Sequence, residues 1–360
     1  MLTEEHGNLL EAPADALVNT VNTVGIMGKG LALQFKQAYP GNFHAYESAC
    51  RHGEVRLGRM FTYETGQLDK PRFVINFPTK GHWRSRSKLS DIKTGLVSLR
   101  EVIQERHIES IAIPPLGCGN GGLEWSDVRP LIVEALGELP GVRVMVYPPQ
   151  ATPSAKSMPV RTRRPRMTAG RSALLAMLGS YIGLSQREEA ATGDGASLLE
   201  IQKLMYFLQE RGQPLGLDYA KGRYGPYADN LNHALEPLEG HYVRGYGDRS
   251  DRVLKLSPIN LIPGAVDEAT EWLEEHGEDK TSARISAVSE LVTGFASAYG
   301  VELLATVHWT ATREVDEGST DPAVLTQVIG KWNERKGRLF TEAHVSKAIN
   351  RLEQLGWIGQ

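Results

Sequence analysis

An alternation of two hydrophobic periods between Ala14 and Pro149 constrains the fold more than any other feature of this sequence. Short apolar runs bounded by turn residues indicate strands, and they are ALVNTVN, GRMFTYET, RFVINFP, SIAIPPL and VRVMVYPP. Helical periodicity occurs in KGLALQFKQAY, SDIKTGLVSLREVIQERH and SDVRPLIVEALGEL, and Ser90 and Ser126 are the expected N-caps of the last two helices. This alternation predicts a mostly parallel sheet that is covered by helices.

The segment PPQATPSAKSMPVRTRRPRMTAGR, from Pro148 to Arg171, breaks both periods, and its richness in Pro, Ser, Lys and Arg favours a linker. Helical patterns dominate beyond it, in SALLAMLGSYIGL, SLLEIQKLMYFLQERG, AVDEATEWLEEHG and ARISAVSELVTGFASAYGVELLATVHW. The tail FTEAHVSKAINRLEQLGWIGQ indicates a last amphipathic helix with a short strand, as at the end of a winged helix. We therefore expect an α/β domain over residues 1–155, a basic Pro-rich linker over 156–170 and a mainly helical domain over 171–360.

Composition narrows the class of protein. Hydrophobic residues make up 41% of the 360 residues, enough for a proper core, and the net charge of -3 argues against a protein that coats nucleic acid in general. The two cysteines, Cys50 and Cys118, provide neither a disulfide framework nor a zinc quartet. No signal-peptide pattern and no apolar run of about 18 residues is present. We expect a cytoplasmic protein without a metal or a membrane partner.

Two glycine-rich turns follow predicted strands. The first, GIMGKG over residues 25–30, fails the P-loop pattern because no Ser or Thr follows its lysine. The second, PPLGCGNGGLEW, matches G-x-G-x-x-G at Gly117, Gly119 and Gly122. A dinucleotide-binding turn opens its domain and has an acidic residue about 20 positions later, and this turn does neither. We therefore reject a dinucleotide fingerprint.

Both turns lie where open α/β sheets bind ligands, at the carboxyl ends of parallel strands. Glycines let the backbone approach a ligand closely and leave N–H groups free to contact an anion. Helices that begin near Lys29 and Ser126 add positive N-terminal ends. Two such turns facing each other suit a diphosphate, and the alternative is that both are ordinary tight turns.

The motifs NTVN, GIMGKGLALQFKQAYP and GCGNGGLEW resemble those of the macrodomain family, an ADP-ribose-binding module with a three-layer α/β/α fold. The string FVINFPTKGHWRSRSKLSDIKTGL resembles the lysine-using branch of DNA ADP-ribosyl glycohydrolases, the DarG antitoxins that are paired with DarT toxins. The resemblance covers residues 1–149 densely. KLMYFLQERG and YAKGRYGPYADNLNHAL are similar to the C-terminal regions of that branch and, more loosely, to Panacea-type antitoxin domains.

The resemblance implies ADP-ribose contacts from the N-terminal segment, the first strand and loop, and the late glycine loop. These residues are Asn8, Leu9, Asn19, Thr20, Asn22, Gly28, Gly30, Leu31, Gly117, Cys118, Gly119, Asn120, Gly121 and Gly122. Two positions depart from the family pattern. Asn8 stands where many macrodomains carry an acid that contacts adenine, so backbone groups of Asn8 and Leu9 are the expected substitute. Gly121 stands where related enzymes place an Asp, and Glu124 is either its replacement or a solvent-facing residue of the first helical turn.

Lys80 is the catalytic residue that the resemblance implies. A neutral lysine amine can attack the anomeric carbon that carries the base, and its neutrality requires burial or a nearby cation. Without the resemblance, a lysine after a strand is most simply an exposed surface residue. Cys118 is a weaker nucleophile candidate, because no histidine lies nearby in the sequence to activate it.

A basic and aromatic group of residues that follows Lys80 has the composition of a rim for single-stranded DNA, in which Trp83 would stack a base. The group consists of His82, Trp83, Arg84 and Arg86. A Trp that packs into the core is the alternative for Trp83. The linker run VRTRRPR is either a further DNA contact or a solvated basic tether.

The function that the resemblance implies is the release of ADP-ribose from a base, thymine by analogy, in single-stranded DNA, with free ADP-ribose as product and no cofactor. The helical domain is then expected to bind the cognate DarT toxin, and acidic faces such as DEATEWLEEHGEDK suit a basic partner. Two alternatives remain open. The first domain binds ADP-ribose without catalysis while the second neutralises the toxin, or the substrate is a protein-linked ADP-ribose ester.

Overall fold

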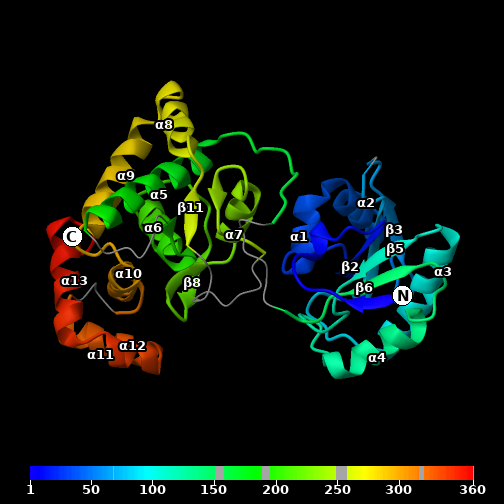
Figure 1. The fold of residues 1–360 in the computed structure, drawn as a ribbon. Coiled ribbons are helices and arrows are strands. Elements are labelled where there is room, and N and C mark those ends of the chain that lie inside the picture. Colours follow the sequence, from blue (N-terminus) through cyan, green and yellow to red (C-terminus); the bar gives the residue numbers. More distant parts are fainter. Residues whose placement is uncertain (68, 151–157, 189–194, 249–257, 316–319, 360) are drawn as a thin grey trace. The chain divides into compact units, whose positions relative to one another are not determined.

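A computed structural model describes residues 1–360 except 68, 151–157, 189–194, 249–257, 316–319 and 360 (Figure 1). The chain divides into two compact units. The first comprises Met1–Arg163 with Gly247–Asp251, and the second comprises Arg164–Tyr246 with Arg252–Gln360. Each unit is described by itself below.

The first unit contains a six-stranded sheet in the order β1-β6-β5-β2-β4-β3. Its strands are β1 (Leu2–Glu4), β2 (Ala16–Asn22), β3 (Phe61–Glu64), β4 (Phe73–Lys80), β5 (Ser110–Ile113) and β6 (Arg143–Val146). All neighbours are parallel except the edge strand β3, which runs antiparallel to β4. The expectation of a mostly parallel sheet is therefore confirmed, with β1 as a strand that the sequence patterns did not predict.

Helices cover both faces of this sheet. They are α1 (Leu31–Ala38), α2 (Pro40–Arg51), α3 (Leu89–Glu105) and α4 (Trp125–Leu136), and a 3-10 turn spans Leu9–Glu11. Alternate side chains of β2 point to opposite faces: Val18 packs in the cluster of α3 and α4, and Leu17 packs with Phe35 of α1. Figure 1 shows α1 and α2 on one side of the sheet and α3 and α4 on the other. The result is three layers, α/β/α.

The expected caps of two of these helices were wrong. Helix α3 begins at Leu89 after Lys88, and α4 begins at Trp125 after Glu124, and neither N-cap residue accepts a side-chain hydrogen bond. Ser90 and Ser126 each lie inside the first turn, two residues after the observed N-cap. The sequence pattern located each helix but shifted its start.

The second unit is mainly helical, as expected. Its helices are α5 (Ala169–Arg187), α6 (Leu198–Glu210), α7 (Leu231–Leu235), α8 (Ala265–Glu275), α9 (Asp279–Val292), α10 (Ala298–Arg313), α11 (Pro322–Trp332), α12 (Glu334–Leu339) and α13 (Glu342–Gln354). Ser197 and Glu200 form a capping box at the start of α6. Helix α10 is buried on nearly all sides, which explains its long apolar run.

Short strands accompany these helices. β8 (Tyr219–Gly222) and β9 (Gly225–Ala228) form a hairpin, while β7 (Gly195–Ala196), β10 (Val243–Arg244) and β11 (Ile259–Leu261) form a small antiparallel sheet. The strand expected after the last helix is absent from the described residues 355–359, so the winged-helix ending was wrong. Within the described residues, no helix combines the length and the apolar character needed to cross a membrane.

Candidate active site at the carboxyl ends of the sheet

Lys80 is the last residue of β4 and lies beside Asn22, the last residue of β2, after a register shift at Val21 and Asn22. Its Nζ donates to the Trp83 carbonyl oxygen at 3.0 Å and to the Asn120 carbonyl oxygen at 2.9 Å. The ammonium therefore joins the loop after β4 to the late glycine loop. Partial burial lowers the pKa of Lys80 below its ordinary value.

The late glycine loop, residues 117–122, presents backbone N–H groups as hydrogen-bond donors. Gly117 and Gly122 adopt positive φ angles of 74° and 72°, a conformation that favours glycine. The Leu123 N–H donates to the Gly117 carbonyl at 3.0 Å and closes the turn. Among the described residues, no acceptor is found for the N–H groups of Gly119 and Asn120. Successive free N–H groups of this kind form an anion-binding concavity.

Gly121 has no room for a side chain. A Cβ atom built there would lie 2.3 Å from Ser87 Oγ and 2.4 Å from the Gly117 carbonyl oxygen, whereas one at Gly119 would meet nothing within 4 Å. The backbone of this loop therefore excludes an Asp at position 121. Glu124 is exposed at the start of α4, in agreement with a solvent-facing role.

Cys118 is a protonated thiol rather than a nucleophile. Burial, reinforced by the carboxylates of Glu124 and Asp127, raises its pKa to about 11. The Sγ donates to the Leu116 carbonyl at 3.6 Å. This removes the weaker of the two nucleophile candidates.

Asn22 organises the first loop. Its Nδ2 donates to the Ile26 carbonyl at 2.6 Å, and its Oδ1 accepts from the N–H groups of Val24 and Ile26 and from the Tyr46 hydroxyl. The side chain is only 5% exposed. Asn22 thus shapes the loop whose glycines, Gly28 and Gly30, precede α1.

Asn19 lies in the interior of the sheet. It is fully buried, and its Nδ2 donates to Asn76 Oδ1 at 3.0 Å. Asn76 in turn donates to Asn42 Oδ1 at 2.7 Å, which ties β2, β4 and α2 together. Thr20 is partly exposed between the two asparagines of β2. Asn19 therefore supports the strand end rather than reaching its surface.

The family resemblance assigned Asn8 and Leu9 to adenine; Asn8 caps the 3-10 turn and Leu9 begins it. Asn8 Oδ1 accepts from the Leu10 N–H at 3.1 Å, its Nδ2 donates to Glu11 at 3.2 Å, and the Leu9 side chain is buried. Leu31 begins α1, and Gly30 precedes it with φ 63°. The side chain of Asn8 caps its own turn.

The predicted DNA rim is an exposed aromatic and basic cluster. His82 and Trp83 stack with ring centroids 5.4 Å apart, and the Arg84 guanidinium lies 4.4 Å from the Trp83 ring. Trp83 is 43% exposed, which excludes a core-packing role. Arg86 instead donates to the Gly122 carbonyl at 3.1 Å and fastens the late loop.

Several supporting residues escaped the sequence patterns. The N–H and Oγ1 of Thr23 both donate to the Gly81 carbonyl, at 3.2 and 2.7 Å, and join the loops after β2 and β4. Val24 and Ile26 are each 44% exposed in the same loop. These contacts join positions that are far apart in the chain, so local patterns give no signal for them.

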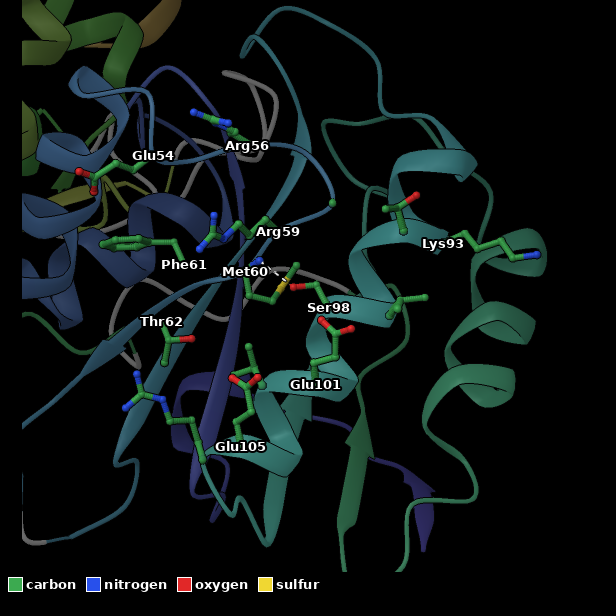
Figure 2. Close-up of a pocket in the computed structure, with 15 residues that line it drawn as sticks. Glu54, Arg56, Arg59, Met60, Phe61, Thr62, Lys93, Ser98, Glu101 and Glu105 are labelled. Carbon is green, nitrogen blue, oxygen red and sulfur yellow. Dashed lines mark hydrogen bonds between the residues drawn. The ribbon is translucent and has the colours of Figure 1, made fainter.

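A cavity of about 1090 Å³ in the first unit lies elsewhere. Figure 2 shows its walls, which come from the segment Glu54–Thr62 and from one side of α3, with basic and acidic side chains mixed. None of the predicted site residues lines it. In the described part of the chain, no group of His, Cys, Asp or Glu has the arrangement of a metal site. The strand ends thus remain the candidate site.

Comparisons with known proteins show which proteins this chain is similar to. A family model for the Macro domain matches residues 18–132. The DNA ADP-ribosyl glycohydrolase of Mycobacterium tuberculosis is 46% identical, over 98% of this chain and 99% of that protein. The DNA ADP-ribosyl glycohydrolase of Thermus aquaticus is 47% identical, over 99% of this chain and 94% of that protein. A DNA ADP-ribosyl transferase-DNA ADP-ribosyl glycohydrolase fusion protein of Thermosipho africanus is 35% identical, over 40% of each chain.

Proposed function

The chain belongs to the DNA ADP-ribosyl glycohydrolase family, and we propose that its macrodomain uses Lys80 to release ADP-ribose from thymine bases of single-stranded DNA. The observation that carries this proposal is the convergence of two loops on Lys80 Nζ, at 3.0 and 2.9 Å. A reacting amine must be held in a fixed position within bonding reach of the anomeric carbon of the sugar. Lys80 is the described lysine whose contacts join these two loops.

The glycine loops supply the anion site. The free N–H groups of Gly119 and Asn120 suit the diphosphate, since backbone donors bind phosphate oxygens without a charged side chain. The loop held by Asn22 lies at the neighbouring strand end and suits the distal ribose. This arrangement keeps the diphosphate on the late loop and presents the sugar to Lys80.

The chemistry begins with the neutral amine of Lys80. It attacks the anomeric carbon, the bond to the base nitrogen breaks, and the electron pair leaves with the base, which takes a proton from water. Opening of the sugar ring gives an imine between Lys80 and the sugar. Water then adds to the imine carbon, the amine departs, and free ADP-ribose is released. The lowered pKa of Lys80 supports the first step, because it increases the neutral fraction.

The experiment that tests the enzyme compares Lys80→Ala with Lys88→Ala. Lys88 is an exposed lysine that precedes α3 and makes no side-chain capping bond, so it is a matched control. We expect Lys80→Ala to slow the release of ADP-ribose from modified single-stranded DNA by about 10²-fold or more, with ADP-ribose affinity changed only a few-fold. Lys88→Ala is expected to match the wild type in both measurements.

Other outcomes assign other functions. If the wild type and Lys80→Ala both bind ADP-ribose and neither releases it, the macrodomain is a binding module. If the wild type acts on a glutamyl-linked protein substrate and not on DNA, the ester is the substrate. Borohydride reduction during turnover, followed by intact mass measurement, is expected to trap one ADP-ribose on the wild type and none on Lys80→Ala.

The second unit is proposed to bind and neutralise a DNA ADP-ribosyltransferase toxin. The relative from Thermosipho africanus carries a DNA ADP-ribosyl transferase and a glycohydrolase in one chain, which supports a functional pairing of the two activities. Helix α8 presents an acidic surface with Asp267, Glu271, Glu274 and Glu275. A protein that binds DNA offers a basic groove that complements such a surface.

Charge neutralisation tests this surface. The substitution Lys80→Ala is first introduced into both proteins that are compared. In this background, the variant Glu271→Gln/Glu274→Gln/Glu275→Gln is expected to inhibit toxin activity on DNA less than the protein that retains the three glutamates. The exposed residues of the control variant are Glu290, Glu342 and Glu353, each changed to Gln. Equal inhibition by the two triple variants would assign toxin binding to another surface.

A further inference from the structure

Ser87 has a buried hydroxyl group without a hydrogen-bond partner, directly beside the late glycine loop. The residue is 6% exposed, and within the described residues no partner is found for its Oγ. Most buried polar side chains are paired, because an unpaired one loses its bonds to water without compensation. An unpaired hydroxyl next to a candidate binding loop therefore needs a functional explanation.

Helix capping does not account for this hydroxyl. A serine that caps a helix accepts a hydrogen bond from an N–H group in the first turn of that helix. Ser87 directly precedes Lys88, the N-cap residue of α3, and in the described part of the chain its Oγ accepts from none of these groups. The hydroxyl therefore has no role at the start of α3.

The hydroxyl faces the backbone of the late glycine loop. A Cβ atom built at Gly121 would lie 2.3 Å from Ser87 Oγ and 2.4 Å from the Gly117 carbonyl oxygen. The two oxygens therefore border one small space between Gly117 and Gly121. The Gly117 carbonyl already accepts from the Leu123 N–H at 3.0 Å, and its second lone pair can accept a further hydrogen bond.

The loop is held at a carbonyl group and open at its donors. The Ser87 N–H donates to the Gly121 carbonyl at 3.0 Å, which keeps the hydroxyl against the loop. Gly119 and Asn120 are exposed, and among the described residues their N–H groups have no acceptor. An anion that binds these N–H groups therefore acts on the same short loop that Ser87 contacts.

We propose that Ser87 is a positioning residue for the diphosphate of ADP-ribose. When phosphate oxygens accept from the free N–H groups of the late glycine loop, the loop shifts and the Ser87 hydroxyl donates to the Gly117 carbonyl. A ligand favours one of two arrangements only through interactions that differ between them, and this hydrogen bond is such an interaction. The proposal rests on the function proposed above, because it places a diphosphate in this loop, but it does not depend on the role of Lys80.

The test compares Ser87→Ala with Ser172→Ala in the full chain. Ser172 of α5 is the matched control, because it is fully buried and its Oγ also lacks a partner within the described residues. Each substitution deletes one unpaired hydroxyl, so neither is expected to lower the midpoint of thermal unfolding without ligand. Isothermal titration calorimetry is expected to give an ADP-ribose affinity about three- to tenfold lower for Ser87→Ala, the effect of one hydrogen bond, and unchanged for Ser172→Ala.

A second ligand shows which part of ADP-ribose the hydroxyl acts on. ADP retains the diphosphate and lacks the distal ribose, so Ser87→Ala is expected to weaken the binding of ADP and of ADP-ribose by the same factor. A loss for ADP-ribose alone would assign Ser87 to the sugar and contradict the proposal.

Two further results would overturn the proposal. One is an unfolding midpoint of Ser87→Ala below that of the wild type without ligand, which would show a hydroxyl that is already paired in the free protein. The other is an ADP-ribose affinity equal to that of the wild type. Release of ADP-ribose from modified DNA, measured in parallel, separates this proposal from the reaction: a wild type that binds ADP-ribose without releasing it would count against the reaction of Lys80 alone.

Discussion

Lys80 of the macrodomain and Lys203 of the helical unit both have a lowered pKa, but they differ in their exposure to solvent and in the groups around them. Lys203 on α6 is fully buried and donates to the Pro226 carbonyl at 2.7 Å, and burial lowers its pKa to about 7. Gly225, with φ 94°, closes over it: a Cβ there would lie 3.2 Å from Lys203 Cε. Lys80 is partly exposed among loops with free backbone donors.

The difference teaches that a perturbed pKa alone does not identify a catalytic lysine. Of these two groups, Lys203 is the more strongly buried, yet its amine is enclosed by the hairpin and has no access to a ligand. Lys80 has a modest burial effect and hydrogen bonds to the carbonyls of two loops. Access and neighbouring backbone donors separate the lysine that we propose as catalytic from the structural one.

The largest effect on stability is expected when the ion network around the buried lysines Lys203 and Lys336 is broken at Glu302. Glu302→Ala leaves Lys336 buried without its carboxylate and is expected to lower the free energy of unfolding by about 3–5 kcal/mol. Glu290→Ala, at an exposed position of α9, is expected to change it by no more than about 0.5 kcal/mol. Urea unfolding followed by tryptophan fluorescence suits this comparison, because Trp272, Trp309, Trp332 and Trp357 report on the second unit.

The pH dependence of the free energy of unfolding sharpens the contrast between Lys203 and Lys80. The folded pKa of Lys203 is about 7 and its ordinary value is 10.5, so between these values the unfolded chain binds more protons. The free energy of unfolding therefore rises with pH in this window, by about 1.4 kcal/mol per unit for this group. The wild type is expected to gain stability relative to Lys203→Met from pH 7.5 to 9.5. Parallel curves would show that Lys203 is charged in the folded protein.

The crowding of the late loop is tested by a pair of glycine substitutions. Gly121→Ala places a methyl group against the Gly117 carbonyl and is expected to destabilise the macrodomain by about 1–3 kcal/mol. Gly119→Ala meets nothing within 4 Å and is expected to cost at most about 0.5 kcal/mol. Thermal unfolding monitored by circular dichroism measures both, and equal midpoints would contradict the tight packing at position 121.

The smallest expected effect is that of Lys80→Ala on stability. The side chain is partly exposed and its acceptors are loop carbonyls, so its removal is expected to change the free energy of unfolding by no more than about 0.5 kcal/mol. Urea unfolding of this variant beside Glu302→Ala measures the difference. A loss of several kcal/mol would make Lys80 a structural residue like Lys203.

Much of the macrodomain fold was predictable because most of its strands correspond to short apolar patterns in the local sequence. β2 and β4 are buried on both faces and are rich in apolar residues, which is typical of central parallel strands. The edge strand β1 was missed because three residues give too short a pattern. Ser90 and Ser126 were misplaced as caps because a favourable cap residue inside the first turn has the same local sequence signature.

The site was less predictable than the fold. Lys80 follows a strand, and its importance came from a family resemblance rather than from any local pattern. The exclusion of a side chain at Gly121 depends on Ser87, a contact across 34 positions that no periodicity encodes. The β8–β9 hairpin and the corner where α11 meets α12 were likewise not expected, so the cavity between them is visible only in three dimensions.

The two hydrogen bonds from Thr23 to the Gly81 carbonyl have a consequence for how such an enzyme diversifies. Because these bonds tie one loop to a single carbonyl of the other, an insertion in either loop would disturb the contact between them. Under the function proposed above, we therefore expect new preferences for a modified base to arise from exchanged side chains on loops of constant length. Natural variants should differ at Val24, Ile26 and Trp83 while the spacing around the shared carbonyl is preserved.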